Sequence, residues 1–232
     1  MRTKASTAAL CLFMGAVTVG CADDGGTTDT RSADQLLGEA YRTMNALTSV
    51  TIGLDVTSGG DRYSGRLTTD LKSRCALKAT SSHGSEMEQI RIGETDYIHP
   101  NDVYLDMWGR KTVPAMRHSP WLKSPVSAAK GADDLVDCAW PFSSFGEATK
   151  ADPTELDGKP VIPVKVTDDE LKGGVYTFYV AAEGKPYLLR IDYKDPRSHR
   201  VTKFSDFNNP VDIQPPAAAD VLDLSSLPPD ES

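Results

Sequence analysis

The chain has 232 residues, of which 39% are hydrophobic and 25% are charged, and this composition suits a soluble domain with its own core. Its formal net charge is −8, and it becomes −10 once residues 1–20 are removed, because that segment carries Arg2 and Lys4 and no acidic residue. Phosphate backbones and anionic lipid headgroups repel an acidic protein. The charge therefore argues against nucleic acid as a partner of the mature chain.

Residues 1–20 have the organisation of a bacterial lipoprotein signal peptide. The basic start is followed by an apolar run, Ala8–Val17, that is too short to span a membrane stably. The run ends in the letters TVGC at residues 18–21, which resemble a lipobox, although Thr18 stands where that family usually has Leu. The resemblance implies that Cys21 is lipidated and becomes the new N-terminus, so that the protein is anchored to the extracytoplasmic side of the cell membrane. An ordinary secretory signal with a chance cysteine is the alternative.

A polar tether and then an amphipathic helix follow the signal segment. Residues 21–32 are small and polar, and the eleven that follow Cys21 would span roughly 20 Å as a flexible coil. Apolar residues then recur at helical spacing, which predicts a helix over Asp34–Leu47 with Ser32 or Asp34 as its cap. We expect its apolar face to pack on a sheet, since an interfacial membrane helix would need several Lys and Arg on the polar side, where only Arg42 is present.

From Ser49 the spacing of apolar residues changes to a period of two, which is typical of a strand with one buried face. The pattern is clearest in Val50–Thr57, and it returns after the turn sequence Gly59-Gly60-Asp61. Turn residues then recur about every ten residues, which is the spacing of a sheet, sandwich or barrel. The further pieces that we predict as strands are Tyr63–Leu71, a run from Cys75, Glu88–Ile92, a piece around Tyr97, and Val103–Trp108.

A second series of strands is predicted over Glu155–Asp212. Its runs are short and rich in Val, Ile, Tyr and Phe, and residues that accept the φ angles of tight turns divide them. These dividers are Asp157-Gly158, Gly173-Gly174, Glu183-Gly184 and Asp195-Pro196. Connections this short join antiparallel neighbours, because a parallel pair needs a long crossover.

A long connection, Arg110–Lys150, separates the two series of strands. We predict one or two short helices in it, over Ser127–Val136 and Phe142–Thr149, which pack over the sheet. A loop of this length inside a compact domain is usually functional. At the other end of the domain, residues 214–232 form a Pro-rich tail that we expect to be partly disordered.

Two cysteines remain in the mature domain. Cys11 leaves with the signal segment and Cys21 would carry lipid, so Cys75 and Cys138 are left. Disulfides persist in exported proteins, and we predict a bridge between these two that ties the connection to the sheet. Two free thiols are the alternative. A metal site is not predicted, because neither cysteine has neighbours at ligand spacing.

The sequence contains no recognisable catalytic motif. The four histidines lie far apart, and the paired carboxylates lack the offsets of a calcium loop. Nucleophile elbows, zinc-protease motifs, P-loops and Rossmann glycine runs are missing. We therefore predict no catalytic residue, no metal and no cofactor, although scattered Ser, His and Asp could still meet in space.

The order of these features resembles the LolA-like carriers and the LppX/LprG-type mycobacterial lipoproteins. The resemblance covers residues 33–213, which we take as a single domain, and includes the passages GRLTTDL, DYIHPNDVYLDMW, ELDGKPVIPVKV and GKPYLLRIDY. It implies an α+β fold, a strongly curved antiparallel β half-barrel covered by the N-terminal helix and a short helical connection. In that family the space between sheet and helices takes acyl chains, and no catalytic residue can be carried over.

Two functions are expected from this reading. The first is an anchored lipoprotein that binds or carries a lipid or other hydrophobic small molecule in an apolar cavity, without catalysis. The residues that we expect to line the cavity are Ile52, Leu54, Leu67, Val164, Val166, Phe178 and Ile191. A core filled by side chains, without a cavity, is the alternative at this level. The second function is a sensing or scaffolding module that binds a protein partner in the cell envelope.

Overall fold

The computed structural model describes residues 29–107, 114–117, 120–128, 135–144, 146–167 and 173–226. The chain divides into two units, residues 1–30 and 31–232, and every element named below belongs to the second. The predicted signal segment and Cys21 lie outside the described residues. Within those residues, no helix is both long enough and apolar enough to cross a bilayer.

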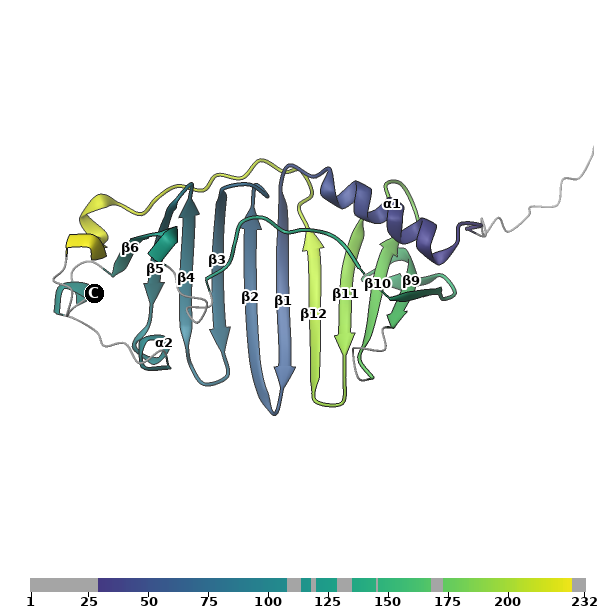
Figure 1. Cartoon of the computed structure of the whole chain (residues 1–232), viewed down its shortest axis with the longest axis horizontal. Coiled ribbons are helices and arrows are strands. Elements are labelled where there is room, and N and C mark those ends of the chain that lie inside the picture. Colours follow the sequence, from purple (N-terminus) through teal and green to yellow (C-terminus); the bar gives the residue numbers. More distant parts are fainter. Residues whose placement is uncertain are drawn as a thin grey trace, which may run out of the picture. The chain divides into compact units, whose positions relative to one another are not determined.

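The described strands form one open sheet of thirteen strands (Figure 1). Their order is β13-β6-β5-β4-β3-β2-β1-β12-β11-β10-β9-β7, and β8 pairs with β9 off this path. The pairing of β13 with β6 is parallel, and the other pairings between described strands are antiparallel. The bounds are β1 Val50–Ser58, β2 Asp61–Thr69, β3 Arg74–Ser81, β4 Glu86–Ile92, β5 Thr95–Pro100, β6 Trp121–Pro125, β7 Glu147–Lys150, β8 Thr154–Leu156, β9 Lys159–Thr167, β10 Val175–Ala181, β11 Leu188–Lys194, β12 Ser198–Ser205 and β13 Val221–Asp223.

The two predicted series of strands join at the centre of this sheet. Strands β1–β5 and β9–β12 are both antiparallel meanders, as the alternation and the tight turns predicted. The turn at Asp157-Gly158 has positive φ at both residues, 52° and 74°, which is why Asp and Gly stand there. The first strand of the domain, β1, pairs with β12, so residues about 150 positions apart in the chain lie side by side.

The predicted N-terminal helix is present as α1, Ala33–Asn45. Ser32 begins it with a capping box, because its hydroxyl accepts a hydrogen bond from the backbone N–H of Gln35 and its own N–H donates to the Gln35 side chain. The helix contacts β7, β10 and β11. Its buried residues are Ala33, Leu36, Leu37, Ala40 and Met44.

A second helix was not predicted. We expected a strand over Val103–Trp108, and this was wrong, since Asp102–Met107 forms helix α2. Asn101 explains the difference: its side-chain oxygen accepts from the N–H of Tyr104 at 2.9 Å and its carbonyl accepts from Leu105 at 3.1 Å. An Asn side chain that satisfies the first free N–H groups starts a helix at a place where the sequence also allows a turn.

The helices predicted in the long connection are largely wrong. In place of a helix over Phe142–Thr149, residues 135–144 have no regular structure and Glu147–Lys150 is strand β7, paired with β9. In the other predicted helix, residues 127–128 belong to the 3₁₀ turn Val126–Ala128 and residues 135–136 have no regular structure, while residues 129–134 lie outside the described part. A further 3₁₀ turn covers Pro114–Arg117. Local helix propensity gives way here to backbone hydrogen bonds with a distant strand.

The described part of the Pro-rich tail is attached to the sheet. Residues 218–220 form a 3₁₀ turn, β13 follows, and Leu224–Ser226 forms another turn. Lys123 on β6 forms a salt bridge with Asp223 on β13 at 2.8 Å. Residues 227–232 lie outside the described part.

Candidate functional site

The register places all seven predicted cavity residues on one face of the sheet, which we call the inner face. Ile52 is paired with Leu67, and the next row across the sheet contains Leu54, Ile191, Phe178 and Val164. Val166 lies two residues beyond Val164 on β9 and therefore faces the same way. The alternation in the sequence was thus sufficient to assign the face.

Burial divides these seven residues into two groups. Ile52, Leu67, Val164, Val166 and Phe178 are between 0 and 4% exposed and belong to the hydrophobic core. Side chains this buried contact protein on all sides and do not border an empty cavity. Leu54 and Ile191 are half-buried. Contact with a ligand stays a prediction for all seven, and these two are the ones with accessible surface.

Helix α1 covers the part of the inner face formed by β10 and β11. The ring of Tyr41 meets the ring of Phe178 edge-on, with centroids 6.1 Å apart. Burial raises the pKa of Tyr41 to about 12, an effect that the nearby Ser144 hydroxyl partly offsets. The Tyr41 hydroxyl is nevertheless buried without a hydrogen bond of good geometry. Tyr41 therefore contributes through apolar contact.

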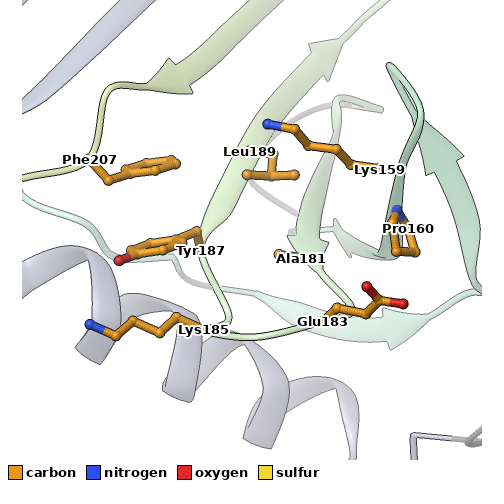
Figure 2. Close-up of a pocket in the computed structure, with 8 residues that line it drawn as sticks. All are labelled: Lys159, Pro160, Ala181, Glu183, Lys185, Tyr187, Leu189 and Phe207. Atoms are coloured by element: carbon orange, nitrogen blue, oxygen red, sulfur yellow. The ribbon is translucent and has the colours of Figure 1, made fainter.

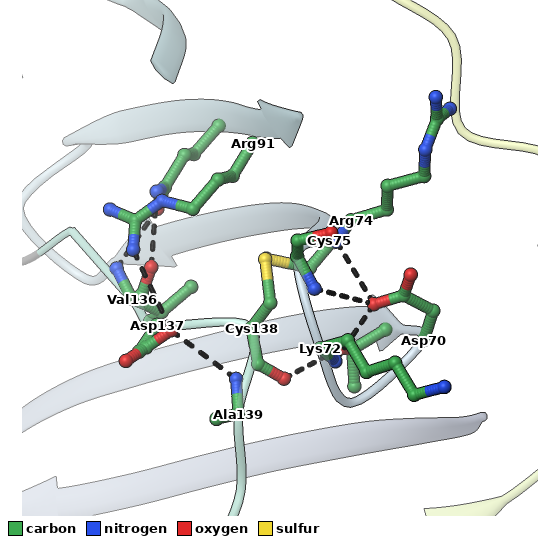
Figure 3. The surroundings of a disulfide bond; sticks show 12 residues. Asp70, Lys72, Arg74, Cys75, Arg91, Val136, Asp137, Cys138 and Ala139 are labelled. Carbon is green, nitrogen blue, oxygen red and sulfur yellow. Dashed lines mark hydrogen bonds and ion pairs between the residues drawn. A yellow bond between two sulfur atoms is a disulfide. The ribbon is translucent and has the colours of Figure 1, made fainter. Parts of the chain in front are cut away.

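Residues 135–144 cross the middle of the inner face, and we call them the strap (Figure 1). A disulfide joins Cys138 to Cys75 on β3, with an S–S distance of 2.10 Å (Figure 3). The predicted bridge is therefore present. The hydroxyl of Thr69, on β2, donates to the carbonyl oxygen of Cys138 at 2.6 Å. Farther along, the ring of Phe142 packs on that of Phe204, on β12, at 5.6 Å.

The β2–β3 turn fixes the position of Cys75. One carboxylate oxygen of Asp70 accepts hydrogen bonds from three successive backbone N–H groups, those of Lys72, Ser73 and Arg74, at 2.8 to 2.9 Å (Figure 3). Leu71 takes a positive φ of 60° to allow this arrangement. The turn is therefore built around one Asp side chain, directly before the bridging cysteine.

Two amides hold the strap by paired hydrogen bonds to its backbone. Gln89, on β4, donates to the carbonyl of Val136 at 3.1 Å and accepts from its N–H at 2.9 Å. Asn45, at the end of α1, does the same with Phe142, at 3.0 and 3.2 Å. The strap is thus attached to both β4 and α1, and no sequence pattern indicates either attachment.

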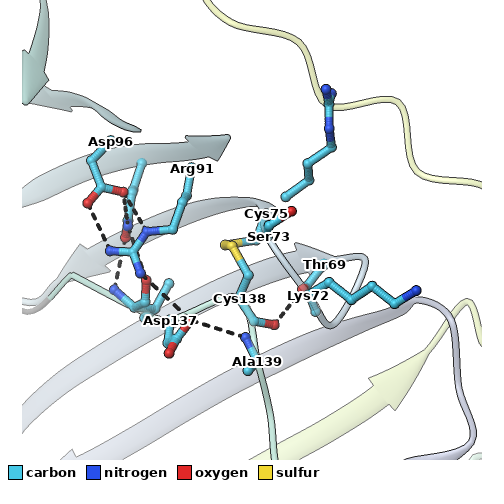
Figure 4. A network of polar contacts seen from close by, with 12 residues as sticks. Thr69, Lys72, Ser73, Cys75, Arg91, Asp96, Asp137, Cys138 and Ala139 are labelled. Atoms are coloured by element: carbon cyan, nitrogen blue, oxygen red, sulfur yellow. Dashed lines mark hydrogen bonds and ion pairs between the residues drawn. A yellow bond between two sulfur atoms is a disulfide. The ribbon is translucent and has the colours of Figure 1, made fainter. Parts of the chain in front are cut away.

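A buried ion pair lies beside the first of these attachments (Figure 4). Arg91 donates twice to Asp96, at 2.7 and 2.8 Å, and Asp96 is 0% exposed. The Gln89 amide donates to the same carboxylate at 2.9 Å, and Asp137 of the strap lies 3.7 Å from Arg91. Hydrogen bonding to Asp96 raises the pKa of Arg91. Each charge is compensated, so this network supports the strap and offers no free acid or base.

Beyond α1 and the strap, the inner face keeps accessible surface. One row of this surface contains Tyr176, Tyr193, Arg200, Val56 and Tyr63, each paired with the next across neighbouring strands. Tyr63 is 41% exposed and Arg200 is exposed, while the other three are half-buried. Together with Leu54 and Ile191 in the row above, they form what we call the open surface.

Aromatic packing shapes one end of the open surface. The rings of Tyr176 and Tyr193 lie 4.6 Å apart, and Tyr176 also stacks on Phe178 at 6.0 Å. A β-carbon at Gly174 would come within 2.6 Å of the Tyr193 hydroxyl, so only glycine allows this ring to lie there. The aromatic row continues the core outward to the accessible part of the face.

A separate pocket of about 330 Å³ lies where the β10–β11 hairpin meets the chain after β12 (Figure 2). The rings of Tyr187 and Phe207 stack in parallel in its wall, with centroids 4.3 Å apart. Its other apolar residues are Pro160, Ala181 and Leu189, and its charged residues are Lys159, Glu183 and Lys185. No sequence signal pointed to this pocket, because Tyr187 and Phe207 stand outside the strands.

Groups suited to metal binding do not gather among the described residues. No group of three or more His, Cys, Asp and Glu side chains there could hold a metal ion. The two bridged cysteines carry no thiol. What the described site offers is apolar and aromatic surface with one exposed arginine.

The fold is shared with two solved mycobacterial structures. LprF from Mycobacterium bovis aligns with a TM-score of 0.52 and 13% identity, over 80% of this chain and 97% of LprF. The lipoprotein LppX from Mycobacterium tuberculosis aligns with a TM-score of 0.50 and 14% identity, over 77% of this chain and 98% of LppX. The chain has the LppX fold. The resemblance predicted from the order of elements is thereby confirmed, and at these identities it concerns the fold alone. No family model and no curated protein matches the sequence.

Proposed function

We propose that this protein is an exported, membrane-anchored lipoprotein that binds a lipid or other hydrophobic molecule without catalysis. One observation carries the proposal. From β2 to β9 the inner face is mostly apolar, and α1 and the strap bury only part of it, so that Leu54 and Ile191 keep accessible surface beside the aromatic row. A contiguous apolar patch that stays accessible on a folded protein often marks a site of interaction.

In this proposal the sheet acts as a half-barrel, and the ligand lies on the open surface against the edge of the core. An acyl chain gains about 0.8 kcal/mol for each buried CH₂ group. Ten such groups would contribute roughly 8 kcal/mol before the costs of association and ordering are subtracted. Useful affinity for the chain therefore does not require charged side chains at the binding surface. Arg91 and Asp96 pair with each other, so they are not needed to explain binding.

The anchor belongs to the same proposal. Lipidation of Cys21 would hold the domain at the extracytoplasmic surface of a membrane, on the tether of residues 21–32. That position supplies the binding surface with a source of lipid at high local concentration. The shared fold with the lipoprotein LppX supports this reading.

Titration of the protein with a fluorescent acyl probe tests the function. We compare the wild type with Leu54→Gln, which places a polar group on the open surface, and with Val201→Gln. Val201 is half-buried on the outer face of β12, opposite Asp55, and serves as the matched control. We expect the first variant to bind about tenfold more weakly, or ~1.4 kcal/mol, and the control to bind like the wild type. A wild type that binds no acyl probe would refute the proposal.

A second candidate is a module that senses or scaffolds through a protein partner. Helix α2 favours it, because Val103 and Met107 are 39 and 48% exposed and stand four residues apart, on one side of the helix. The discriminating variant is Val103→Ser with Met107→Ser. If this double variant loses a co-purifying envelope protein and the wild type carries no lipid, the second candidate replaces the first.

A further inference from the structure

Arg200 is a cation on the apolar face of the sheet. The side chains of β12 alternate, so that His199 and Lys203 lie on the outer face, while Arg200 lies on the same face as Thr202 and Phe204. The register places Arg200 directly between Val56 on β1 and Tyr193 on β11. It is exposed, and it completes a row whose other members are apolar or aromatic.

Arg200 has no carboxylate partner within the described ranges. Arg91, on the same face, pairs with Asp96, whereas Arg62 and Arg74, which have no carboxylate partner there either, lie on the outer face. Asp55 and Asp192, which pair with the adjacent Val201, lie on the outer face. Asp195, in the β11–β12 turn, serves its own turn. It accepts from the N–H groups of Arg197 and Ser198, both at 2.7 Å, and from the Ser198 hydroxyl at 2.8 Å.

The neighbours of Arg200 suit an acidic group attached to an apolar body. Tyr63, two strands away on the same row, has an exposed side chain whose hydroxyl can donate to an acidic group beside the guanidinium. The Tyr193 hydroxyl, one strand away, is hydrogen-bonded to Asp195. Leu54 and Ile191 belong to the adjacent row, two residues along the strands, or about 7 Å. A ligand whose acidic group contacts Arg200 would thus place its apolar chain against Leu54.

We propose that the ligand is an anionic amphiphile whose acidic group is bound by Arg200 and whose chain lies along Leu54 and Ile191. This inference rests on the proposed function and adds its ligand class. Arginine is suited to the role because its planar guanidinium binds carboxylate or phosphate through two parallel hydrogen bonds. The chain as a whole is acidic, so a free anion is repelled, and selection requires the apolar contact as well.

The test uses probes that share one acyl chain and differ in the head: a fatty acid, its neutral methyl ester, and a single-chain phosphate monoester. Binding of each is measured to the wild type, to Arg200→Gln and to Lys203→Gln. The control removes the same charge from the same strand on the opposite face, where Lys203 is exposed. Thermal unfolding of both variants verifies that the fold is retained.

We expect the wild type to bind at least one acidic probe about tenfold more tightly than the ester, or ~1.4 kcal/mol. Arg200→Gln should reduce this preference to about twofold or less while its affinity for the ester stays unchanged. Lys203→Gln should keep the preference. Raising the salt concentration should weaken the preference of the wild type for the acidic probe, since the contact with Arg200 is partly exposed. The ratio between the carboxylate and phosphate probes identifies the preferred acid.

The outcomes separate this inference from the function on which it rests. If the wild type binds acid and ester equally, the ligand class is refuted and the hydrophobic binding function stands. If both variants lose the preference to the same extent, overall charge and not Arg200 is responsible, and the inference fails. If no probe with an acyl chain binds, the proposed function itself fails.

Discussion

Removal of the Cys75–Cys138 bridge should lower the stability of the domain by an amount that follows from its place in the chain. The two cysteines are 63 residues apart, and the bridge closes that length into a loop. The chain-entropy relation for such a loop gives ~14 cal/mol/K, or about 4.3 kcal/mol at 25 °C. We therefore expect Cys75→Ser with Cys138→Ser to reduce the free energy of unfolding by about 4 kcal/mol.

The strap should nevertheless remain in place in the folded variant. The paired hydrogen bonds of Gln89 and Asn45 and the Phe142–Phe204 contact do not depend on the disulfide. The loss therefore arises mainly from the greater freedom of the unfolded chain. For a domain of this size, 4 kcal/mol corresponds to a fall in Tm of about 8–16 °C.

Urea unfolding followed by tryptophan fluorescence measures the effect. Reduction of the wild type should reproduce the double variant, whereas the variant itself should not respond to reductant. The slope of the unfolding transition should rise, because an uncrosslinked chain exposes more surface. If the variant unfolds within about 1 kcal/mol of the wild type, the bridge does not constrain the unfolded chain and the reasoning is refuted.

Three further predictions concern the core, a buried hydroxyl and the anchor. Val166→Phe should cost about 1–3 kcal/mol of unfolding free energy, because Val166 is 1% exposed, whereas Leu54→Phe should cost less; equal costs would contradict the division between core and open surface. Burial raises the pKa of Tyr41 to about 12, so the wild type should lose stability as the pH rises from about 10 toward that value, and Tyr41→Phe should show a smaller loss in alkaline unfolding curves, because Tyr179 and Tyr193, whose pKa values are also raised, remain. Cys21→Ala should release the protein from the membrane fraction, and unchanged fractionation would exclude lipidation.

Local sequence signals were sufficient for most of the sheet and for α1. Alternation in Val50–Thr57, the Asp157-Gly158 turn and the Ser32 cap each act through neighbouring residues, and each is present as predicted. The Cys75–Cys138 pair followed from the compartment and from the number of cysteines left after processing.

The missed elements depend on distant partners. Glu147–Lys150 is a strand because β9 supplies its hydrogen bonds, and nothing in its own four residues requires this. The strap is fixed by side chains such as Gln89 and Asn45, which the sequence presents as ordinary polar residues. No local pattern indicates either contact.

The sequence could predict only the face of the sheet on which the candidate site lies. Alternation assigned Val166 and Leu54 to the same side correctly, but which of them is buried depends on where α1 and the strap lie. Arg200 was missed for a related reason. Its position between Val56 and Tyr193 requires the pairing of β12 with β1, the two ends of the domain.

The most direct test of the binding function is mass spectrometry of a solvent extract from natively purified, exported protein. Extraction releases non-covalent lipid and leaves any lipid on Cys21 attached, so the two do not interfere. We predict that the wild type and Val201→Gln yield a hydrophobic molecule near one equivalent, and that Leu54→Gln yields much less. An extract of the wild type that contains no such molecule, or equal amounts from all three proteins, would contradict a ligand on the open surface.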